Sequence, residues 1–329
     1  MGGDRAPRAV VEGAVSAART PGTDLILVGD QPQVETEMRR SVNGSRPPAI
    51  TLHHASQVIG MGESPTAAVK AKRDSSLVVA ARLVREGKAE AFVSMGNTGA
   101  CMTTAALILG RLEGVQRAAI AVPIPHATGT VTVIDAGANV DCRPSHLAQF
   151  AVMGGVYAEL IHGIARPRIG LLNVGEEEGK GNEMVQETHD LLRNAGLNYV
   201  GNIEGRDVVN GRVDVVVCDG FVGNIVLKFA EGMADAIKQM IRDAYRASGV
   251  LGALGAWLSK PAFRRLKDRL DPASYGGAPL LGVNGVCIVG HGASSPQAIA
   301  NAIGVAERVV QLRANSLIRE RLRAARLAR

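Results

Sequence analysis

The chain has 329 residues, of which 46% are hydrophobic and 21% charged, a balance typical of a globular protein with a sizeable core. The net charge of +6 is concentrated at the C-terminus, where Arg313–Arg329 holds six arginines and one glutamate, a local charge of +5. The rest of the chain is nearly neutral. It therefore lacks the broad basic face of a nucleic-acid-binding protein, and we expect no nucleic-acid partner.

The cysteine spacing and the hydropathy of the chain exclude further classes of protein. The four cysteines lie far apart and form no CxxC pair, which argues against a zinc site or a redox motif. The first residues lack the apolar core of a signal peptide, and no stretch of about 18 apolar residues follows. We therefore expect a cytoplasmic protein without a membrane-spanning helix.

One supersecondary unit recurs along the chain: a Val/Ile-rich run, a turn with glycine, and a long helical pattern. A first strand is predicted at 24–30, and strand–turn–helix units follow at 89–110, 130–161, 168–196, 213–246 and 285–312. This alternation predicts an α/β fold, doubly wound around a mostly parallel sheet with helices on both faces. Ligands bind beyond the carboxyl ends of such strands, so we expect the turns to converge at one edge of the sheet.

The segment "GLLNVGEEEGKGNE" (170–183) sets Lys180 between two glycines, where a strand is expected to end and a helix to begin. The free N–H groups of a helix N-terminus attract anions, and the ammonium adds a point charge. Lys180 is therefore a candidate anion ligand. The alternative is an ordinary loop lysine paired with one of the glutamates at 176–178.

Two further turns, "GNTGA" (96–100) and "DGFVGN" (219–224), also place glycine and amides before a helix, an arrangement that exposes N–H groups to small oxyanions. The segment "GHGASSPQA" (290–298) reads as another such turn, capped by serine, rather than as a Ser–His pair. The polar and glycine positions of these turns that are candidate substrate ligands are Asn97, Thr98, Gly99, Asn139, Asn182, Asp219, Gly223, Asn224, His291 and Ser294.

Several chemistries lack their motifs in this sequence. There is no GxxxxGK[ST] loop, no GxGxxG turn directly after a strand and no GxSxG elbow. The carboxylates of Asp135, Asp141 and Asp219 could hold a metal, but their spacing matches no ligand motif. We therefore expect neither a cofactor nor a metal.

We expect a single α/β catalytic domain over 1–329. Two segments of it do not follow the strand–turn–helix pattern. Residues 248–277 predict a helical insertion, a pair of helices split near Pro261. The pair could pack on the domain or lie at a dimer interface. Alternatively, it could form an apolar, basic-rimmed surface for acyl chains or membrane. Its candidate contact residues are Trp257, Arg264, Arg265, Lys267 and Arg269. Residues 313–329 predict a basic C-terminal helix, packed on the domain or contacting an acidic partner or anionic lipid.

Blocks along the whole chain resemble the bacterial phosphate acyltransferase family (PlsX) of phospholipid synthesis. These blocks are "MGGDRAP" (1–7), "GESPTAAVKAKRDSS" (62–76), "SMGNTGA" (94–100), "DAGANVDCRP" (135–144), "FAVMG" (150–154), "LLNVGEEEGKGNE" (171–183), "GNIEGRD" (201–207), "CDGFVGN" (218–224) and "GAPLLGVNGVCIVGHGAS" (277–294). Family members usually carry a short strand of the form VAVDA before "MGGD", so we expect the first strand of the sheet to be missing from this sequence.

The resemblance implies transfer of an acyl group from acyl-carrier protein to inorganic phosphate, which gives an acyl phosphate. It implies a fold similar to phosphotransacetylases and to the isocitrate/isopropylmalate dehydrogenase group. It also implies a cytosolic homodimer that works at the inner face of the membrane and supplies a membrane acyltransferase. In this family the residues most tied to activity match Lys180 and Asn224.

Three rival functions share parts of this pattern. A phosphotransacetylase acting on a coenzyme A ester would use the same thioester and phosphate chemistry. A metal-dependent, nicotinamide-using decarboxylating dehydrogenase has the same architecture, but its fingerprint and metal-ligand spacing are missing. A non-catalytic lipid-binding or scaffold protein would fit the apolar insertion but would leave the polar turns unexplained.

Overall fold

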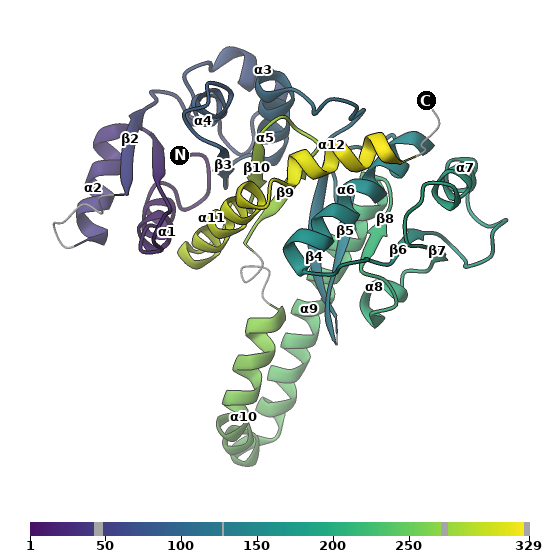
Figure 1. Cartoon of the computed structure of the whole chain (residues 1–329). Helices are drawn as coiled ribbons and strands as arrows, with labels where there is room; N and C mark the ends of the chain where they lie inside the picture. Colours follow the sequence, from purple (N-terminus) through teal and green to yellow (C-terminus); the bar gives the residue numbers. More distant parts are fainter. Residues whose placement is uncertain (43–48, 127, 271–275, 326–329) are drawn as a thin grey trace.

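A sheet of eight strands forms the middle layer of the structure, a computed structural model that describes residues 1–42, 49–126, 128–270 and 276–325 (Figure 1). The side chains of residues 266–270 are also outside this description. In spatial order the strands are β3 (Ala91–Ser94), β10 (Val286–Val289), β9 (Ala278–Leu281), β4 (Ala119–His126), β5 (Gly129–Ile134), β8 (Val215–Val217), β6 (Ile169–Leu172) and β7 (Tyr199–Ile203). Most pairings are parallel, which confirms the predicted mostly parallel α/β sheet.

The sheet reverses direction in its middle. Strand β9 is antiparallel to β10, and β4 is antiparallel to both β9 and β5. Strands β3 and β10 therefore run opposite to β5, β8, β6 and β7. The register agrees: Ile134 at the end of β5 lies opposite Ala121, and Ala119 at the start of β4 lies opposite Leu281 at the end of β9.

The carboxyl ends of the two halves therefore point in opposite directions, but the register brings them to nearly the same level of the sheet: Ile134 pairs with Ala121 in β4, and Val289 pairs with Ala278, three residues before Leu281, the partner of Ala119. We call the edge where β5, β8 and β6 end the β5 edge, and the edge where β3 and β10 end the β3 edge. The convergence of all the turns at one site stays a prediction. The short strands β9 and β4, which the repeating units did not include, turn the direction of the sheet between them.

Apolar side chains alternate between the two faces of the sheet, as strand geometry requires. On one face Ile134, Val215 and Leu171 pack in the main core with α1 (Arg8–Ala17), α6 (Pro144–His162), α7 (Glu183–Arg193), α11 (Pro296–Gln311) and α12 (Ala314–Ala324). The other face is covered by α4 (Ser76–Arg85), α5 (Thr98–Thr104), the π-helical turn η1 (Ala105–Leu109), α8 (Asp207–Asn210) and the start of α9 (Gly220–Ala247). Each predicted strand–turn–helix unit is therefore present.

A smaller parallel pair, β1 (Leu25–Gly29) and β2 (Ile50–His54), stands beside the large sheet with α1 and α2 (Gln31–Ser41) around it (Figure 1). Strand β1 confirms the strand predicted at 24–30. Helix α3 (Pro65–Ala71) lies against α5. The helix starts follow their sequence signals: Asp30 and Ser75, for example, accept hydrogen bonds from backbone N–H groups in the first turns of α2 and α4.

Helices α9 and α10 (Gly249–Leu270) form a pair that projects away from the body (Figure 1). The expected split near Pro261 is wrong, because the reversal occurs at Gly249, whose φ of 58° suits glycine, and α10 continues through Pro261. The hydroxyl of Tyr245 in α9 donates to Ser259 across the pair at 3.2 Å. Among the helices of the described residues, none is long and apolar enough to cross a membrane.

Helix α12 packs on the body of the protein. Ile318 is fully buried, and the Asn315 amide donates to the carbonyl oxygens of Val283 and Gly285. Two of its arginines form ion pairs with the body, Arg321 with Glu159 and Arg323 with Glu113. Of the two alternatives for this segment, the packed helix describes Ala314–Ala324, while residues 326–329 lie outside the description.

Candidate active site

Three polar turns meet the β5 edge on neighbouring strands. One follows β5, the second follows β8 and opens α9, and the third follows β6 and opens α7. They carry Asn139, Asn224 and Lys180 respectively. The β5 edge therefore groups the two residues most tied to activity by the resemblance.

Lys180 lies on an exposed loop that is fixed through its backbone. The Lys180 N–H donates to the Glu177 carbonyl at 3.1 Å, and the Lys180 carbonyl accepts from the Asn173 side-chain amide at 3.0 Å. Asn182 then caps α7 by accepting from the Val185 N–H at 3.0 Å. The ammonium is thus carried on an ordered loop just before a helix N-terminus, as the sequence predicted.

The neighbouring glutamates pair with arginines from other elements. Glu176 lies 2.8 Å from Arg212 and 3.4 Å from Arg206, and Glu178 lies 3.0 Å from Arg193. The hydrogen bond from Arg212 holds the pKa of Glu176 below its ordinary value.

Lys180 forms no ion pair with any residue that the structure describes. The alternative, in which Lys180 is a loop lysine paired with one of these glutamates, is therefore wrong. Sequence reasoning missed the three arginines because they lie far along the chain in elements that only the fold brings to this loop.

Buried polar residues underlie the same loop. The Asn202 amide donates to the Glu177 carbonyl at 3.1 Å, and Asn202 is only 3% exposed. His189 and Tyr199 share a hydrogen bond of 2.7 Å beneath Glu178. The loop that carries Lys180 is therefore supported from below by the interior.

The second turn opens α9 with Asp219, whose carboxylate accepts from the Val222 N–H at 2.9 Å. Gly223 follows in the first turn, and a Cβ there would lie 1.9 Å from the Asp135 carbonyl oxygen, so only glycine fits. Asn224 comes next and is exposed; its Cβ is 3.6 Å from where a Cβ on Gly137 would lie. Asp219 and Gly223 thus have structural reasons for their identity, whereas Asn224 is an exposed residue beside Gly137.

The amide of Asn139, an expected substrate ligand, is already engaged within the protein. It donates to the Ala118 carbonyl at 2.7 Å and to the Asp135 carboxylate at 2.8 Å. Asp135 itself accepts several N–H groups and Asp219 caps α9, so these two carboxylates serve the backbone.

The remaining candidate turns lie at the β3 edge. Asn97 is buried, accepts from the Ala100 N–H at 2.9 Å and donates to the Met61 and Glu63 carbonyls at 3.0 Å, which ties a neighbouring loop to α5. Thr98 is exposed, and a Cβ on Gly99 would press on Pro65 at 2.7 Å.

His291 is exposed, and its Nδ1 accepts from the Ala293 N–H at 3.2 Å within the turn that also holds Ser294. The residue that caps α11 is Ser295. Asn97, Thr98, Gly99, His291 and Ser294 are thus gathered at the β3 edge, after strands that run opposite to those that precede Lys180 and Asn224.

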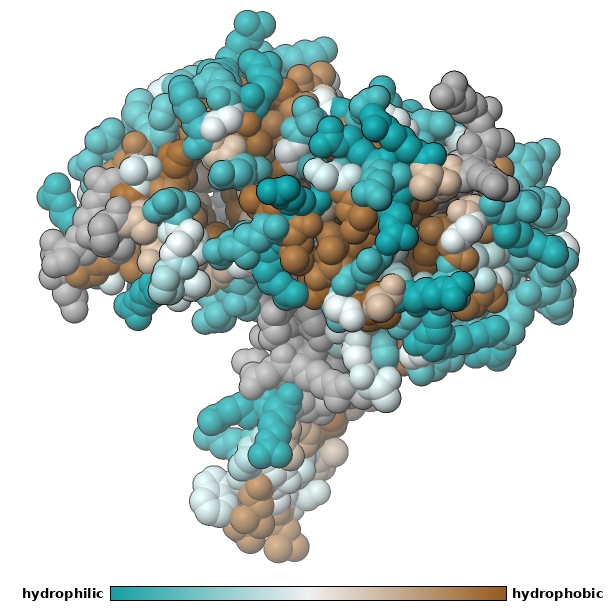
Figure 2. All heavy atoms as spheres, viewed as in Figure 1, coloured by the Kyte–Doolittle hydropathy of each residue, from teal (hydrophilic) through white to brown (hydrophobic). Residues whose placement is uncertain are grey.

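The candidate carrier or membrane residues lie on α10, away from both edges (Figure 1). Trp257 is 69% exposed, and Arg264 and Arg265 are exposed as well. The side chains of Lys267 and Arg269 fall outside the described residues. Figure 2 shows apolar surface at the free end of the projecting pair, where Val250 and Leu251 are 88% and 80% exposed.

The fold belongs to a known class of α/β proteins. It resembles the EutD phosphotransacetylase from Staphylococcus aureus with a TM-score of 0.60 at 17% identity, over 92% of each chain. A phosphotransacetylase from Streptococcus pyogenes gives 0.56 at 16% identity, over 93% of this chain and 99% of that one. At such identities the likeness concerns the fold alone, and it confirms the expected similarity to phosphotransacetylases.

Sequence comparison then gives the family. Residues 1–317 match the family model described as "Fatty acid synthesis protein", and the chain belongs to this family. It is 51% identical over 313 residues to the phosphate acyltransferase of Pelotomaculum thermopropionicum, covering 95% of this chain and 90% of that protein. It is 50% identical over 322 residues to the phosphate acyltransferase of Heliobacterium modesticaldum, covering 98% and 96%. The resemblance drawn from the sequence blocks is thereby confirmed.

Proposed function

We propose that this protein is a phosphate acyltransferase that moves a fatty acyl group from the thioester of acyl-carrier protein to inorganic phosphate. Membership of the family and full-length relatives of that name support the reaction class. The observation that carries the site assignment is the exposed Lys180, without an ion pair among the described residues, before α7 and one strand away from Asn224.

The reaction needs little acid–base assistance. A phosphate oxygen attacks the thioester carbonyl carbon, the C–S bond breaks, and the carrier leaves as a thiolate that takes a proton from solvent. Phosphate is largely dianionic near neutral pH, with a second pKa of about 6 to 7 by analogy with phosphomonoesters, and the leaving thiol has a pKa near about 8.5. Orientation can supply roughly 7–11 kcal/mol of the barrier reduction.

Lys180 and the N–H groups that open α7 would bind the phosphate dianion, because they combine a point charge with the positive end of a helix dipole. The amide of Asn224 would donate to the oxyanion that forms on the thioester carbonyl. The turn at 96–100 follows β3, which runs opposite to the strand β8 that precedes Asn224. We assign the oxyanion donor to Asn224 alone.

The α9–α10 pair would serve as the contact with carrier protein and membrane. Acyl-carrier protein is acidic, and Arg264 and Arg265 offer exposed positive charge near Trp257. The apolar residues at the start of α10 would enter the interfacial layer of a membrane. In this arrangement the enzyme acts as a cytoplasmic protein peripherally bound to the inner face, where a membrane acyltransferase would take the acyl phosphate.

We also propose a homodimer formed through α9. Six large apolar side chains of this helix are between 44% and 68% exposed and recur every three or four residues, which places them on one face: Phe221, Ile225, Phe229, Met233, Ile237 and Met240. We call this set the α9 stripe. It runs about 30 Å from the body towards the free end. A flat membrane would reach only the free end, whereas a second copy can cover the whole length.

One experiment separates this function from its nearest rival. The protein is incubated with labelled phosphate and either an acyl-carrier-protein thioester or the matching coenzyme A thioester. We expect acyl phosphate from the carrier thioester at a much higher kcat/KM. Preference for the coenzyme A ester would instead assign a phosphotransacetylase-type activity, the alternative that the fold neighbours keep open, and no acyl phosphate from either would refute both.

A further inference from the structure

Asp135 is a fully buried carboxylate that faces only hydrogen-bond donors. It accepts from the backbone N–H groups of Ile120 at 3.0 Å, Gly137 at 3.1 Å, Ala138 at 2.9 Å and Asn139 at 2.7 Å, and from the Asn139 side-chain amide at 2.8 Å. Burial raises the pKa of Asp135, and these donors oppose that rise. An ionised carboxylate is acceptor-only, so it suits a site with five donors, which is why we take it as charged.

This carboxylate shapes the turn against which α9 begins. The Gly220 N–H donates to the Asn139 carbonyl at 2.7 Å, and the Asp135 N–H donates to the Cys218 carbonyl at 3.0 Å. A Cβ on Gly220 would lie 2.9 Å from the Asp135 carboxylate, and one on Gly223 would lie 1.9 Å from its carbonyl oxygen. The turn and the first turn of α9 are therefore in direct backbone contact.

Asn224 follows Gly223 directly and lies beside Gly137 of the same turn. A change in the turn therefore shifts the helix residue that carries the Asn224 amide. We propose that Asp135 is a positioning residue for Asn224: it holds the 135–139 turn, the turn fixes the start of α9, and α9 aims the amide at the reacting carbonyl. This inference rests on the proposed function, in which Asn224 acts on the oxyanion.

The test compares two buried aspartates. Asp135→Asn removes the anion that holds the turn. Asp214→Asn is the matched control, because Asp214 is 8% exposed and accepts from both the backbone and the side chain of Arg168, at the start of β8 rather than at the β5 edge. We expect Asp135→Asn to lower kcat by about 10- to 100-fold, as displacement of a catalytic group by about 1 Å does, with an unchanged KM for phosphate. Asp214→Asn should lower the melting temperature and keep kcat within about twofold, because it lies outside the site.

A double variant distinguishes positioning from general damage. If Asp135 acts through Asn224, Asp135→Asn combined with Asn224→Ala should be no slower than Asn224→Ala alone. Multiplying losses would overturn the inference. So would an Asp135→Asn protein with full kcat while Asn224→Ala is slow, a result that would leave the proposed function intact. Full activity in Asn224→Ala would instead overturn the proposed role of Asn224 and, with it, this inference.

Asn139→Ala provides the milder variant if Asp135→Asn fails to fold. It removes one of the five donors to Asp135 and the bond to the Ala118 carbonyl. We expect a fall in kcat of about 3- to 10-fold, equivalent to roughly one hydrogen bond of net strength, with an unchanged KM for phosphate and the same absence of further loss in the Asn224→Ala background. A raised KM for phosphate with normal kcat would make Asn139 a substrate ligand and refute the positioning role.

Discussion

At the scale of single residues, the site depends on which charges are already paired. Lys180 sits beside three glutamates, and in sequence it could be neutralised by any of them. In the structure Glu176 and Glu178 pair with Arg212 and Arg193 instead. An ammonium without a partner among the described residues is available to an anion, and this is the physical basis for its proposed role in binding phosphate.

Replacing Lys180 by alanine should therefore act on phosphate binding. A hydrogen bond to a charged group contributes about 1.5–3 kcal/mol, so the KM for phosphate should rise by about 10- to 150-fold. The KM for the acyl-carrier thioester should stay nearly constant in the same steady-state assay. Lys88→Ala, at an exposed lysine paired with Glu86, is the control. A rise confined to the KM for the carrier would show that Lys180 does not bind phosphate.

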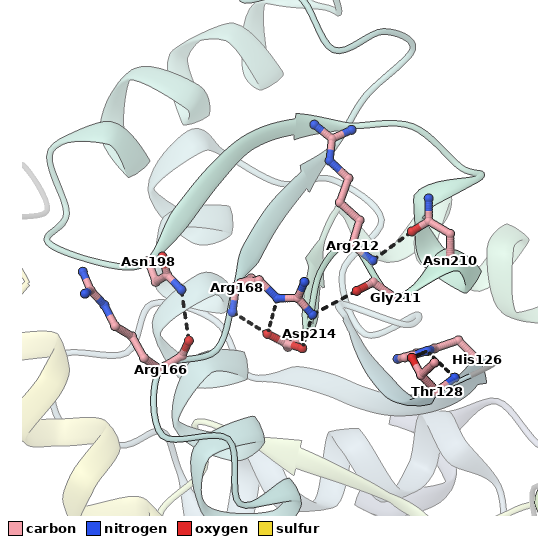
Figure 3. Close-up of polar contacts among 9 residues, drawn as sticks. All are labelled: His126, Thr128, Arg166, Arg168, Asn198, Asn210, Gly211, Arg212 and Asp214. Carbon is pink, nitrogen blue, oxygen red and sulfur yellow. Dashed lines mark hydrogen bonds and ion pairs between the residues drawn. The ribbon is translucent and has the colours of Figure 1, made fainter.

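Another paired charge, Asp214, holds the start of β8. Arg168 donates hydrogen bonds to the Asp214 carboxylate from its backbone N–H at 2.7 Å and from its guanidinium at 2.9 and 3.0 Å. The guanidinium also donates to the Gly211 carbonyl (Figure 3). Burial alone would raise the pKa of Asp214, but the side-chain and backbone hydrogen bonds from Arg168 outweigh it and hold the pKa below its ordinary value.

The lowered pKa of Asp214 predicts how the free energy of unfolding changes with pH. A carboxyl whose pKa is lowered in the folded state stabilises the protein above its ordinary pKa of about 3.9, and this contribution is lost as the pH falls through the folded value. Asp214→Asn should lower the free energy of unfolding by about 1–3 kcal/mol at pH 7. In urea titrations the gap from the parent protein should shrink as the pH falls below about 4. An equal gap at pH 7 and pH 3 would contradict the assignment.

At the scale of elements, α10 carries the surface that we propose for contact with carrier protein and membrane. The helix continues through Pro261 and carries its basic and apolar residues on one projecting rod. Arg264 and Arg265 are exposed and form no ion pair with the described residues. Charges of this kind mainly steer association, and their effect falls with salt.

Reversing both charges, Arg264→Glu with Arg265→Glu, should weaken binding of acyl-carrier protein by about tenfold at low salt. Adding Lys267→Glu should weaken it further. The measurement is the KM for the carrier thioester, with sedimentation on anionic liposomes in parallel. Arg85→Glu, an exposed arginine on α4, is the control. Unchanged carrier binding and unchanged sedimentation would remove α10 from both roles.

At the scale of the whole molecule, the projecting pair leaves a long apolar surface. The α9 stripe has charged residues of both signs beside it, Lys228 with Glu231 and Lys238 with Asp235, each joined by an ion pair. An isologous interface brings the same patch of two copies together, which suits an apolar stripe with balanced charges at its margin.

Phe229→Asp should therefore disrupt the proposed dimer. It places a charge at the middle of the α9 stripe, where Phe229 is 67% exposed in the single chain, and it should weaken self-association by about 100-fold or more. Sedimentation velocity across a range of concentrations measures the change. Val209→Asp, a matched change at an exposed apolar residue of α8, should leave the dimer intact. A parent protein that is monomeric at micromolar concentration would refute the proposal.

Much of the fold could be predicted because its signals are local. Apolar runs, glycine turns and capping residues such as Asp219 and Asn182 act within a few residues, so strands β5, β6 and β8 and the helices after them were found. The Lys180 and Asn224 turns were found for the same reason. The course of α10 through Pro261 was missed, because a proline signals a break and a neighbouring helix can override it.

The sequence by itself determined which segments form strand–turn–helix units and which family the chain belongs to. It also singled out Lys180 and Asn224 as the candidate active-site residues. Tertiary structure alone decided the strand directions, since the antiparallel strands β9 and β4 reverse the sheet between the strands that precede Asn97 and His291 and those that precede Lys180 and Asn224. It also decided which charges pair and that Asn139 faces inward to Asp135. The reason is physical: local propensity depends on neighbours in the chain, whereas strand direction, ion pairing and burial depend on residues that only the folded chain brings together.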